Sequence, residues 1–364
     1  MLQLSIIACA PSRVEIKDGI PMLIGTYTDG KSEGLYSCLF DQETADAVSV
    51  CYAKFENPSY VTCSEDGTKV YAVNEINTTM ASIYSFGLDG KTGMLSVLND
   101  RRTLGEDPCY IATNGKVVVT ATYNGGSMTV HAIREDGSLD SIDTLFYGKA
   151  TGPDTIRQKT PHVHCALFSP DGKYIFATDF SSDRILRFDV IPDKVIPRES
   201  DEITHVPAGS GPRHLTFSPN GKQAYLINEL SGMVIAYNYH DGKLEEIQTI
   251  AADTVGARGS AHIQLSHDGK FLYASNRLKA DGIAIFAVNG NDGTLTKVGY
   301  QPTRRHPRHF NITPNDKFLL VACRDDNAIE IYERDSISGL LKNIDKTLLL
   351  DKPVCVQFVP RPKD

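Results

Sequence analysis

A short two-strand pattern recurs along this chain at an almost constant interval, and it limits the possible folds more than any other feature. Each copy has a short apolar strand, a turn of the Ser-Pro-Asp-Gly-Lys type, and a second strand that closes on a polar or aromatic residue. The closing residues, spaced by 48, 48, 57, 49, 48 and 47 positions, are Tyr27, Glu75, Tyr123, Phe180, Glu229, Arg277 and Arg324. A third alternating strand follows in each unit, and often a fourth. Four short strands in about 48 residues are typical of a β-propeller blade.

The two ends of the chain complement each other. The first copy starts with its second strand, at residues 22–27, and lacks the proline-led first strand. The last segment, residues 352–360, is a proline-led first strand with no second strand after it. We therefore predict an all-β fold: a single seven-bladed β-propeller over residues 21–364, closed by a C-terminal strand that completes the N-terminal blade.

Residues 1–20 are set apart from the propeller as a leader or a disordered segment. MLQLSIIACA resembles the end of a bacterial lipoprotein signal, but it lacks a basic start and a long apolar stretch. None of the eight cysteines forms a Cys-x-x-Cys pair, and most lie in apolar strands. We expect a cytoplasmic protein. The alternative, if the start is truncated, is a bacterial envelope lipoprotein with Cys9 as its lipidation site.

Charge and composition exclude several classes of partner. The net charge is −8, which argues against nucleic acid, and no apolar run reaches the roughly 18 residues of a membrane-spanning segment. Glycine-rich phosphate loops are absent. His162 and His164 could hold zinc with a third ligand, but the arginines predicted nearby would repel a cation. We therefore expect no metal, no cofactor, and a monomer or weak homo-oligomer.

The predicted hairpins bring distant polar residues to one rim of the channel. In each blade the start of the first strand and the end of the second lie at the same end of the hairpin. The basic and acidic residues placed there are His162, His164, Arg213, His214, Glu229, His262, Arg277, Arg308, His309 and Arg324. Such a rim suits a small anion held by guanidinium groups. Tyr123 and Asn124 form a neutral wall suited to polyol contacts.

One spacing is longer than the others. The extra residues lie between Leu145 and Pro161, just before the fourth blade. They are interpreted either as a loop that covers the binding rim or as a neutral surface insertion.

Several segments carry a family resemblance, namely PHVHCALFSPDGKYIF, GSGPRHLTFSPNGKQAYLINE, YASNR, TYNGGS and HPRHFNITP. With these the chain resembles the lactonase family of seven-bladed propellers. It is most similar to the bacterial 6-phosphogluconolactonase branch and more distantly to 3-carboxy-cis,cis-muconate lactonizing enzymes. The resemblance implies a catalytic set of His164, Arg213, Glu229 and Arg277, although spacing alone does not choose His164 over His162. Members of the family often carry glutamine where Arg324 stands, which leaves its role open.

The resemblance implies hydrolysis of 6-phospho-D-glucono-1,5-lactone to 6-phosphogluconate, a step of the pentose phosphate pathway. We expect His164 or Glu229 to be the general base, and Arg213 and Arg277 to hold the oxyanion and the phosphate. The expected substrate-binding residues are His162, Tyr123, Asn124, His214, His262, Arg308, His309 and Arg324. Two alternatives stay open: a muconate-type cyclase or other lactonase acting on a carboxylated substrate, and a propeller that binds a ligand or protein without chemistry.

Overall fold

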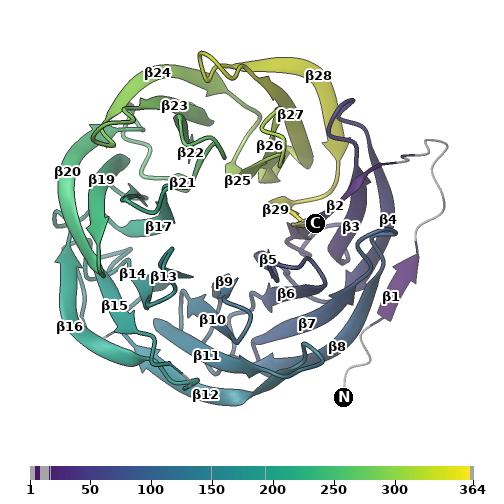
Figure 1. Ribbon diagram of the computed structural model, residues 1–364, viewed down its shortest axis with the longest axis horizontal. Helices are drawn as coiled ribbons and strands as arrows, with labels where there is room; N and C mark the ends of the chain where they lie inside the picture. The colour runs from purple at the N-terminus through teal and green to yellow at the C-terminus, as the bar shows by residue number, and fades with distance from the viewer. Residues whose placement is uncertain (1–4, 9–15, 17, 149, 193, 361–364) are drawn as a thin grey trace.

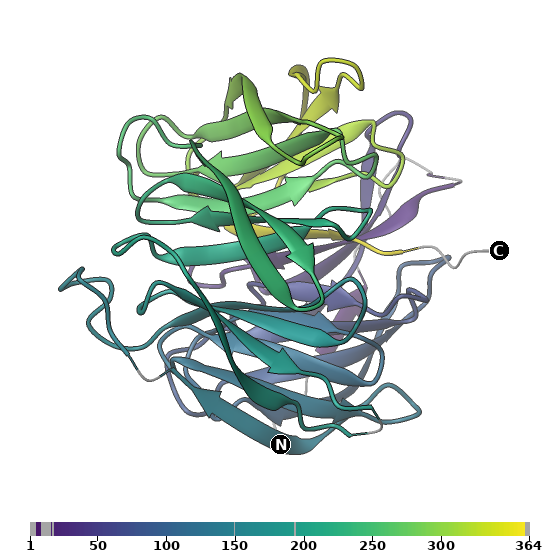
Figure 2. The same ribbon diagram turned by 60° about the vertical axis from the view of Figure 1, so that its left-hand side comes forward.

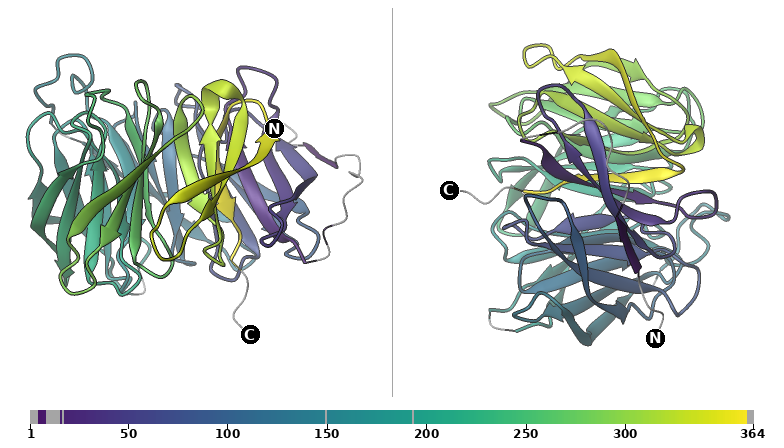
Figure 3. Two further views of the ribbon diagram at one scale, coloured as in Figure 1. Left: turned by 90° about the horizontal axis from the view of Figure 1, so that it is seen from above. Right: turned by 90° about the vertical axis from the view of Figure 1, so that its right-hand side faces the viewer.

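Seven antiparallel sheets stand around a central channel in the computed structural model, which describes residues 5–8, 16, 18–148, 150–192 and 194–360. Figure 1 looks down this channel, with one strand of each sheet innermost. Viewed from the side, the strands of each blade run between the two faces of a disc (Figures 2 and 3). The predicted seven-bladed β-propeller is confirmed.

The strands follow the same order in every blade, from the channel outward. The first blade contains β29 (Pro353–Phe358), β2 (Ile20–Thr26), β3 (Gly34–Phe40), β4 (Ala47–Lys54) and β1 (Ser5–Ala8). The second contains β5 (Val61–Cys63), β6 (Lys69–Asn74), β7 (Ser82–Leu88) and β8 (Leu95–Arg102). The third contains β9 (Pro108–Thr113), β10 (Val117–Thr122), β11 (Ser127–Ile133) and β12 (Leu139–Tyr147).

The remaining four blades, like the second and third, each contain four strands that are consecutive in the sequence. The fourth contains β13 (Val163–Phe168), β14 (Tyr174–Asp179), β15 (Arg184–Asp189) and β16 (Arg198–His205). The fifth contains β17 (Pro212–Phe217), β18 (Gln223–Asn228), β19 (Met233–His240) and β20 (Lys243–Ala251). The sixth contains β21 (Ser260–Leu265), β22 (Phe271–Asn276), β23 (Gly282–Val288) and β24 (Leu295–Pro302). The seventh contains β25 (Pro307–Ile312), β26 (Phe318–Cys323), a 3₁₀ turn η1 (Arg324–Asp326), β27 (Ala328–Arg334) and β28 (Leu341–Leu349).

The ring closes as the sequence predicts. Strand β29 pairs antiparallel with β2, with Met22 opposite Phe358 and Gly25 opposite Cys355. The last strand of the chain is therefore the innermost strand of the first blade (Figure 1). Without it, β2 would present an unpaired edge to the channel.

The N-terminal segment differs in part from the expectation of a leader or disordered stretch. Ser5–Ala8 forms β1, which pairs with β4 along the outer edge of the first blade, with Ser5 opposite Lys54. Strand β2 already begins at Ile20. Cys9, and with it the lipidation hypothesis, lies outside the described residues. No helix among the described residues is long and apolar enough to cross a membrane.

The core lies between neighbouring blades. The second strand of each blade is almost completely buried, as in β22 and β26, because sheets pack against both of its faces. One cluster joins Ile24 and Phe40 of the first blade to Phe318 and Ile331 of the seventh. Each such side chain stabilises the fold by roughly 1.5–3 kcal/mol. The outermost strands, such as β20, alternate between exposed and partly buried residues.

A backbone hydrogen bond recurs at the rim of all seven blades. The residue that closes the second strand donates its N–H to a carbonyl that precedes the innermost strand, as Glu229 does to Gly211 at 2.8 Å and Arg277 to Gly259 at 3.2 Å. The other five donor–acceptor pairs are Tyr27–Lys352, Glu75–Asn57, Tyr123–Asp107, Phe180–His162 and Arg324–His306. These bonds hold the closing side chains of all seven blades at one mouth of the channel.

Candidate active site

A β-bulge near the start of the innermost strand sets which side chains reach the channel mouth. In β13 and β17 the ladder passes from Val163 to Cys165 and from Pro212 to His214, which leaves His164 and Arg213 unpaired. Arg308 is skipped in the same way in β25. A bulge turns its extra residue out of the regular alternation, a common device for aiming a side chain at a site.

A cavity of about 180 Å³ opens at this mouth. It is lined by Tyr27, Glu75, Cys109, Tyr123, Arg157, His164, Glu229, Arg277 and Arg308. The predicted catalytic residues His164, Glu229 and Arg277 therefore meet in one place. The volume is small beside the roughly 300–1,000 Å³ of sites for drug-sized ligands, and it suits a single sugar ring.

The carboxylate of Glu229 is the centre of the charge network. Its Oε2 accepts from Arg213 Nε at 2.8 Å and lies 3.3 Å from Arg277 Nη2, while Oε1 accepts from Arg157 Nη2 at 2.7 Å. Burial opposes ionisation of Glu229, but the three arginines outweigh it and hold its pKa well below the usual range. Both oxygens are thus engaged, and Glu229 is better placed to fix the arginines than to take up a proton.

His164 is an uncharged residue in the cavity wall, close to the charged groups. Burial, assisted by Arg213, lowers the pKa of His164 well below its usual value, so the ring is neutral at pH 7. Its Nδ1 lies 3.7 Å from the thiol of Cys109, and its Nε2 has no hydrogen-bond partner among the described residues. A neutral imidazole with a free nitrogen in a water-accessible cavity can accept a proton.

Arg213 lies behind the cavity rather than in its wall. Its guanidinium donates to Glu229 and, through Nη1, to the carbonyl of Ala261 at 2.6 Å, and only 2% of the residue is exposed. Arg213 is thus not among the residues that line the cavity, where direct contact with the oxyanion or the phosphate was expected. Arg277 does line the cavity.

Arg277 is held in place by a residue the sequence did not single out. Its Nη1 lies 3.2 Å from Nε2 of His306, and its Nε donates to the carbonyl of Gly259 at 2.8 Å. His306 Nδ1 in turn lies 3.3 Å from the carboxylate of Asp325. Nη2 of Arg324 also lies 3.3 Å from this Nδ1, so each ring nitrogen faces a guanidinium. Because a guanidinium only donates, His306 Nε2 is the acceptor in its contact with Arg277. Burial and the nearby arginines lower the pKa of His306 to about 2.

A second carboxylate, Glu75, occupies the far wall of the cavity. The hydroxyls of Tyr27, at 2.9 Å, and Ser59 donate to it, and Arg308 Nη2 lies 3.7 Å away. The Arg308 guanidinium also stacks on the Tyr27 ring at 5.3 Å. Glu75 occupies in the second blade the position that Glu229 occupies in the fifth. A glutamate at this position of the repeat is therefore not by itself specific for a catalytic residue.

Three of the predicted substrate-binding histidines lie beneath the cavity instead of in it. Pairing resumes after the bulge at His214 and at His309, whereas His262 is one of two residues skipped in β21. The three rings form a buried aromatic cluster with Tyr60 and Tyr110. His214 accepts from Arg213 at Nε2 and so donates its Nδ1 proton to His262 Nδ1 at 3.0 Å. Burial lowers the pKa of all three, to about 3 for His309. None of the three is among the residues that line the cavity.

The other predicted residues lie around the mouth. His162 stacks on Tyr123 at 4.1 Å and bonds its backbone carbonyl at 2.7 Å, so it supports the cavity wall without lining it. Asn124 donates to Asp107, a half-buried acid whose pKa is raised to about 6 by burial and by Glu75. Arg324 lies outside the cavity against Asp325, at 2.6 Å. Tyr123 itself is in the wall, as expected.

The long connection before the fourth blade supplies the one cavity arginine that sequence analysis missed. Arg157 reaches from this segment to Glu229, to the Tyr123 hydroxyl at 3.3 Å and over the Phe180 ring at 5.4 Å. The interpretation of the segment as a neutral insertion is therefore wrong. The extra length of the segment indicated a contribution to the rim, but no other blade has an equivalent residue that would have pointed to Arg157.

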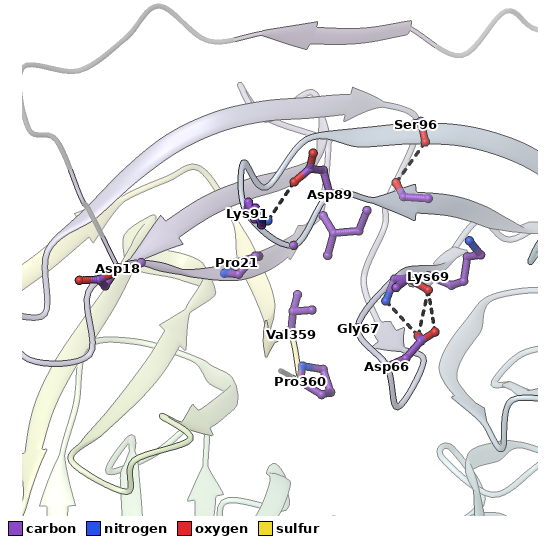
Figure 4. A pocket seen from close by; sticks show the side chains of 15 residues that line it. Asp18, Pro21, Asp66, Gly67, Lys69, Asp89, Lys91, Ser96, Val359 and Pro360 are labelled. Carbon is purple, nitrogen blue, oxygen red and sulfur yellow. Dashed lines mark hydrogen bonds between the residues drawn. The ribbon is translucent and has the colours of Figure 1, made fainter. Parts of the chain in front are cut away.

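A larger hollow, of about 1,080 Å³, lies away from this mouth between the first two blades. Figure 4 shows exposed charges there, including Asp66, Lys69, Asp89 and Lys91, which bond within their own turns or lie free of one another. Among the residues that the structure describes, it is lined by no histidine or arginine, whereas the smaller cavity is lined by both. No group of three or more potential metal ligands occurs within the described ranges.

Both the sequence and the fold are similar to those of known proteins. A model described as lactonase, 7-bladed β-propeller, matches residues 21–358. The 6-phosphogluconolactonase of Bacillus subtilis is 35% identical over 346 residues, covering 92% of this chain and 97% of that one. A Bacteroides uniformis crystal structure, provisionally described as a 6-phosphogluconolactonase, superposes with a TM-score of 0.93 at 62% identity, over 94% of this chain and all of the other. The periplasmic gluconolactonase of Pseudomonas aeruginosa gives 0.89 at 31% identity, over 95% and 100%.

Proposed function

The chain belongs to the lactonase family of seven-bladed β-propellers, and from this we propose that it hydrolyses a sugar-acid lactone, 6-phospho-D-glucono-1,5-lactone, to 6-phosphogluconate. The observation that carries the proposal is the neutral His164 beside Arg277 and Glu229 in one sugar-sized cavity. Curated relatives of this name cover almost the whole chain.

The charge of the cavity suits this substrate. Among the described residues, the guanidinium groups of Arg157, Arg213, Arg277 and Arg308 meet the carboxylates of Glu75 and Glu229. Two positive charges are left uncompensated. A phosphate monoester carries about −1.5 to −2 at pH 7, which matches that excess.

The reaction needs a base, charge stabilisation at the carbonyl and a proton for the ring oxygen. His164 Nε2 takes a proton from water as the water oxygen bonds to C1. The guanidinium of Arg277 stabilises the oxyanion that forms. The C1–O5 bond then breaks, and the imidazolium of His164 returns its proton to O5. Glu229 stabilises the transient imidazolium and holds Arg213 and Arg277 in place.

A direct assay tests the proposal. The phosphorylated lactone is generated in situ and its disappearance is followed by proton release, since each ring opening at neutral pH yields one carboxylate and one proton. Because the lactone also opens spontaneously, the enzyme must raise the rate above the uncatalysed one in proportion to its concentration. A rate independent of enzyme concentration would refute the activity. A muconate-type or other carboxylated substrate turned over in its place would favour the cyclase alternative.

A further inference from the structure

The segment that carries Arg157, residues 150–160, is held firmly against the rim. Gln158 is fully buried, and its Nε2 donates to the carbonyl of Phe180 and to Asp183 Oδ1, both at 2.9 Å. Its Oε1 accepts the N–H of Asp154 at 3.1 Å. Asp154 also accepts the N–H groups of Ile156 and Arg157, at 2.9 and 2.8 Å, and pairs with Arg258. Arg157 is thus presented by a pre-organised turn.

Arg157 has donors to spare, whereas Arg277 is largely committed. Its hydrogen bonds to Glu229 and Tyr123 both use Nη2, and Nε and Nη1 have no hydrogen-bond partner among the described residues. Its side chain is 37% exposed, against 5% for Arg277 and 16% for Arg308. Arg277 spends Nε and Nη1 on Gly259 and His306. Arg308 forms no hydrogen bond among the described residues, but it is less exposed and stacks on the Tyr27 ring. Arg157 is therefore the most exposed guanidinium of the cavity, and it has two donors free for a ligand.

The exposed guanidinium of Arg157 lies where the phosphate of the bound substrate is expected, away from the reacting carbonyl. When C1 faces His164 and Arg277 in the depth of the cavity, the exocyclic phosphate on C6 projects from the ring toward the mouth. A guanidinium fork binds phosphate oxygens in a bidentate manner, through two parallel N–H groups such as Nε and an Nη. Building on the proposed function, we propose that Arg157 binds this phosphate and sets the preference of the enzyme for phosphorylated over neutral sugar lactones.

The test compares Arg157→Gln with the wild-type chain on 6-phosphogluconolactone and on glucono-1,5-lactone. We expect the ratio of kcat/KM for the phosphorylated over the neutral lactone to fall by about 10- to 100-fold, the range for loss of one or two charge-assisted hydrogen bonds. Most of the fall should come from a higher KM. Arg157→Lys should restore part of the ratio, because it keeps the charge but not the fork. The matched control is Lys159→Gln, which removes an exposed cation from the same segment and should leave the ratio unchanged.

A binding measurement separates this role from a catalytic or structural one. Calorimetry with 6-phosphogluconate and with gluconate should show the same fall in selectivity for Arg157→Gln, without any turnover. Equal losses for both ligands, or no loss for either, would overturn the role of Arg157. A wild-type chain that binds 6-phosphogluconate with the expected selectivity but opens neither lactone would refute the proposed activity and leave the phosphate contact standing.

Discussion

His164 and Arg213 occupy the same bulged position in neighbouring blades, yet one faces the cavity and the other supports it from behind. The imidazole lines the cavity wall, and the longer guanidinium turns along Glu229 toward the carbonyl of Ala261. This difference underlies the proposal that His164 transfers the proton and Arg213 positions Glu229.

The first prediction separates two histidines that lie two residues apart. His164→Ala should lower kcat by about 10²- to 10⁴-fold, the usual worth of a general base. His162→Ala removes a ring that stacks on Tyr123 without lining the cavity, so we expect a loss below about tenfold. Proton-release kinetics with the spontaneous rate subtracted will measure both. Equal losses would contradict the assignment of the base.

The second prediction concerns Glu229. Glu229→Gln leaves Arg213 and Arg277 buried without their counter-charge, which should lower the unfolding free energy by about 3–5 kcal/mol and kcat by at least about 100-fold. The chain should still fold, because the amide keeps the shape. Urea unfolding and turnover are measured on the same preparation. Glu75→Gln serves as the comparison, and wild-type turnover in Glu229→Gln would disprove the role.

The third prediction tests the support of Arg277 by His306. His306→Ala removes the acceptor of Arg277 Nη1 and should lower kcat about tenfold with a smaller change in KM. His306→Gln, which offers a carbonyl acceptor, should recover part of kcat. A purely structural role would instead lower thermal stability in both variants without this recovery.

The fourth prediction is acid sensitivity of the fold. His164, His214, His262, His306 and His309 have native pKa values below the value of about 6.5 expected in the unfolded chain. Below that pH the unfolded chain binds protons that the native chain does not, so stability falls as pH falls. Each histidine contributes up to about 1.4 kcal/mol per pH unit. Asp107, with a native pKa of about 6, opposes this between pH 6 and 4, but it is a single group.

Urea unfolding at pH 7.5, 6 and 5 measures this slope. His309→Asn should make it shallower, whereas His240→Asn, at an exposed position, should not. A wild-type stability that stays constant from pH 7.5 to 5 would contradict the presence of neutral buried histidines.

The parts of the site that follow from hairpin topology could be predicted, and those that depend on a one-residue bulge could not. Glu229 and Arg277 lie at the cavity because they close second strands, which a regular repeat makes visible. Without knowledge of the bulge, the sequence could not say that Arg213 turns behind Glu229. Nor could it show that His214, His262 and His309 fall one layer below the cavity.

Arg157 could not be predicted from the sequence for a different reason. It belongs to an insertion, so no other blade offers a residue to compare with it. The direction of its side chain depends on a buried hydrogen bond between Gln158 and Asp183, two residues that the repeat does not relate to each other. The repeat identifies the positions that all blades have in common. Arg157 lies outside those positions, so the repeat could not reveal it.

The pairing of β29 with β2 also constrains the order of events during synthesis. The innermost strand of the first blade is made after every other strand of the ring, so this blade stays incomplete until β29 has been synthesised. Tyr27, which follows β2 and contacts Arg308, donates its N–H to the carbonyl of Lys352, just before β29. A nascent chain that stalls before residue 353 therefore has neither a closed ring nor a finished pocket.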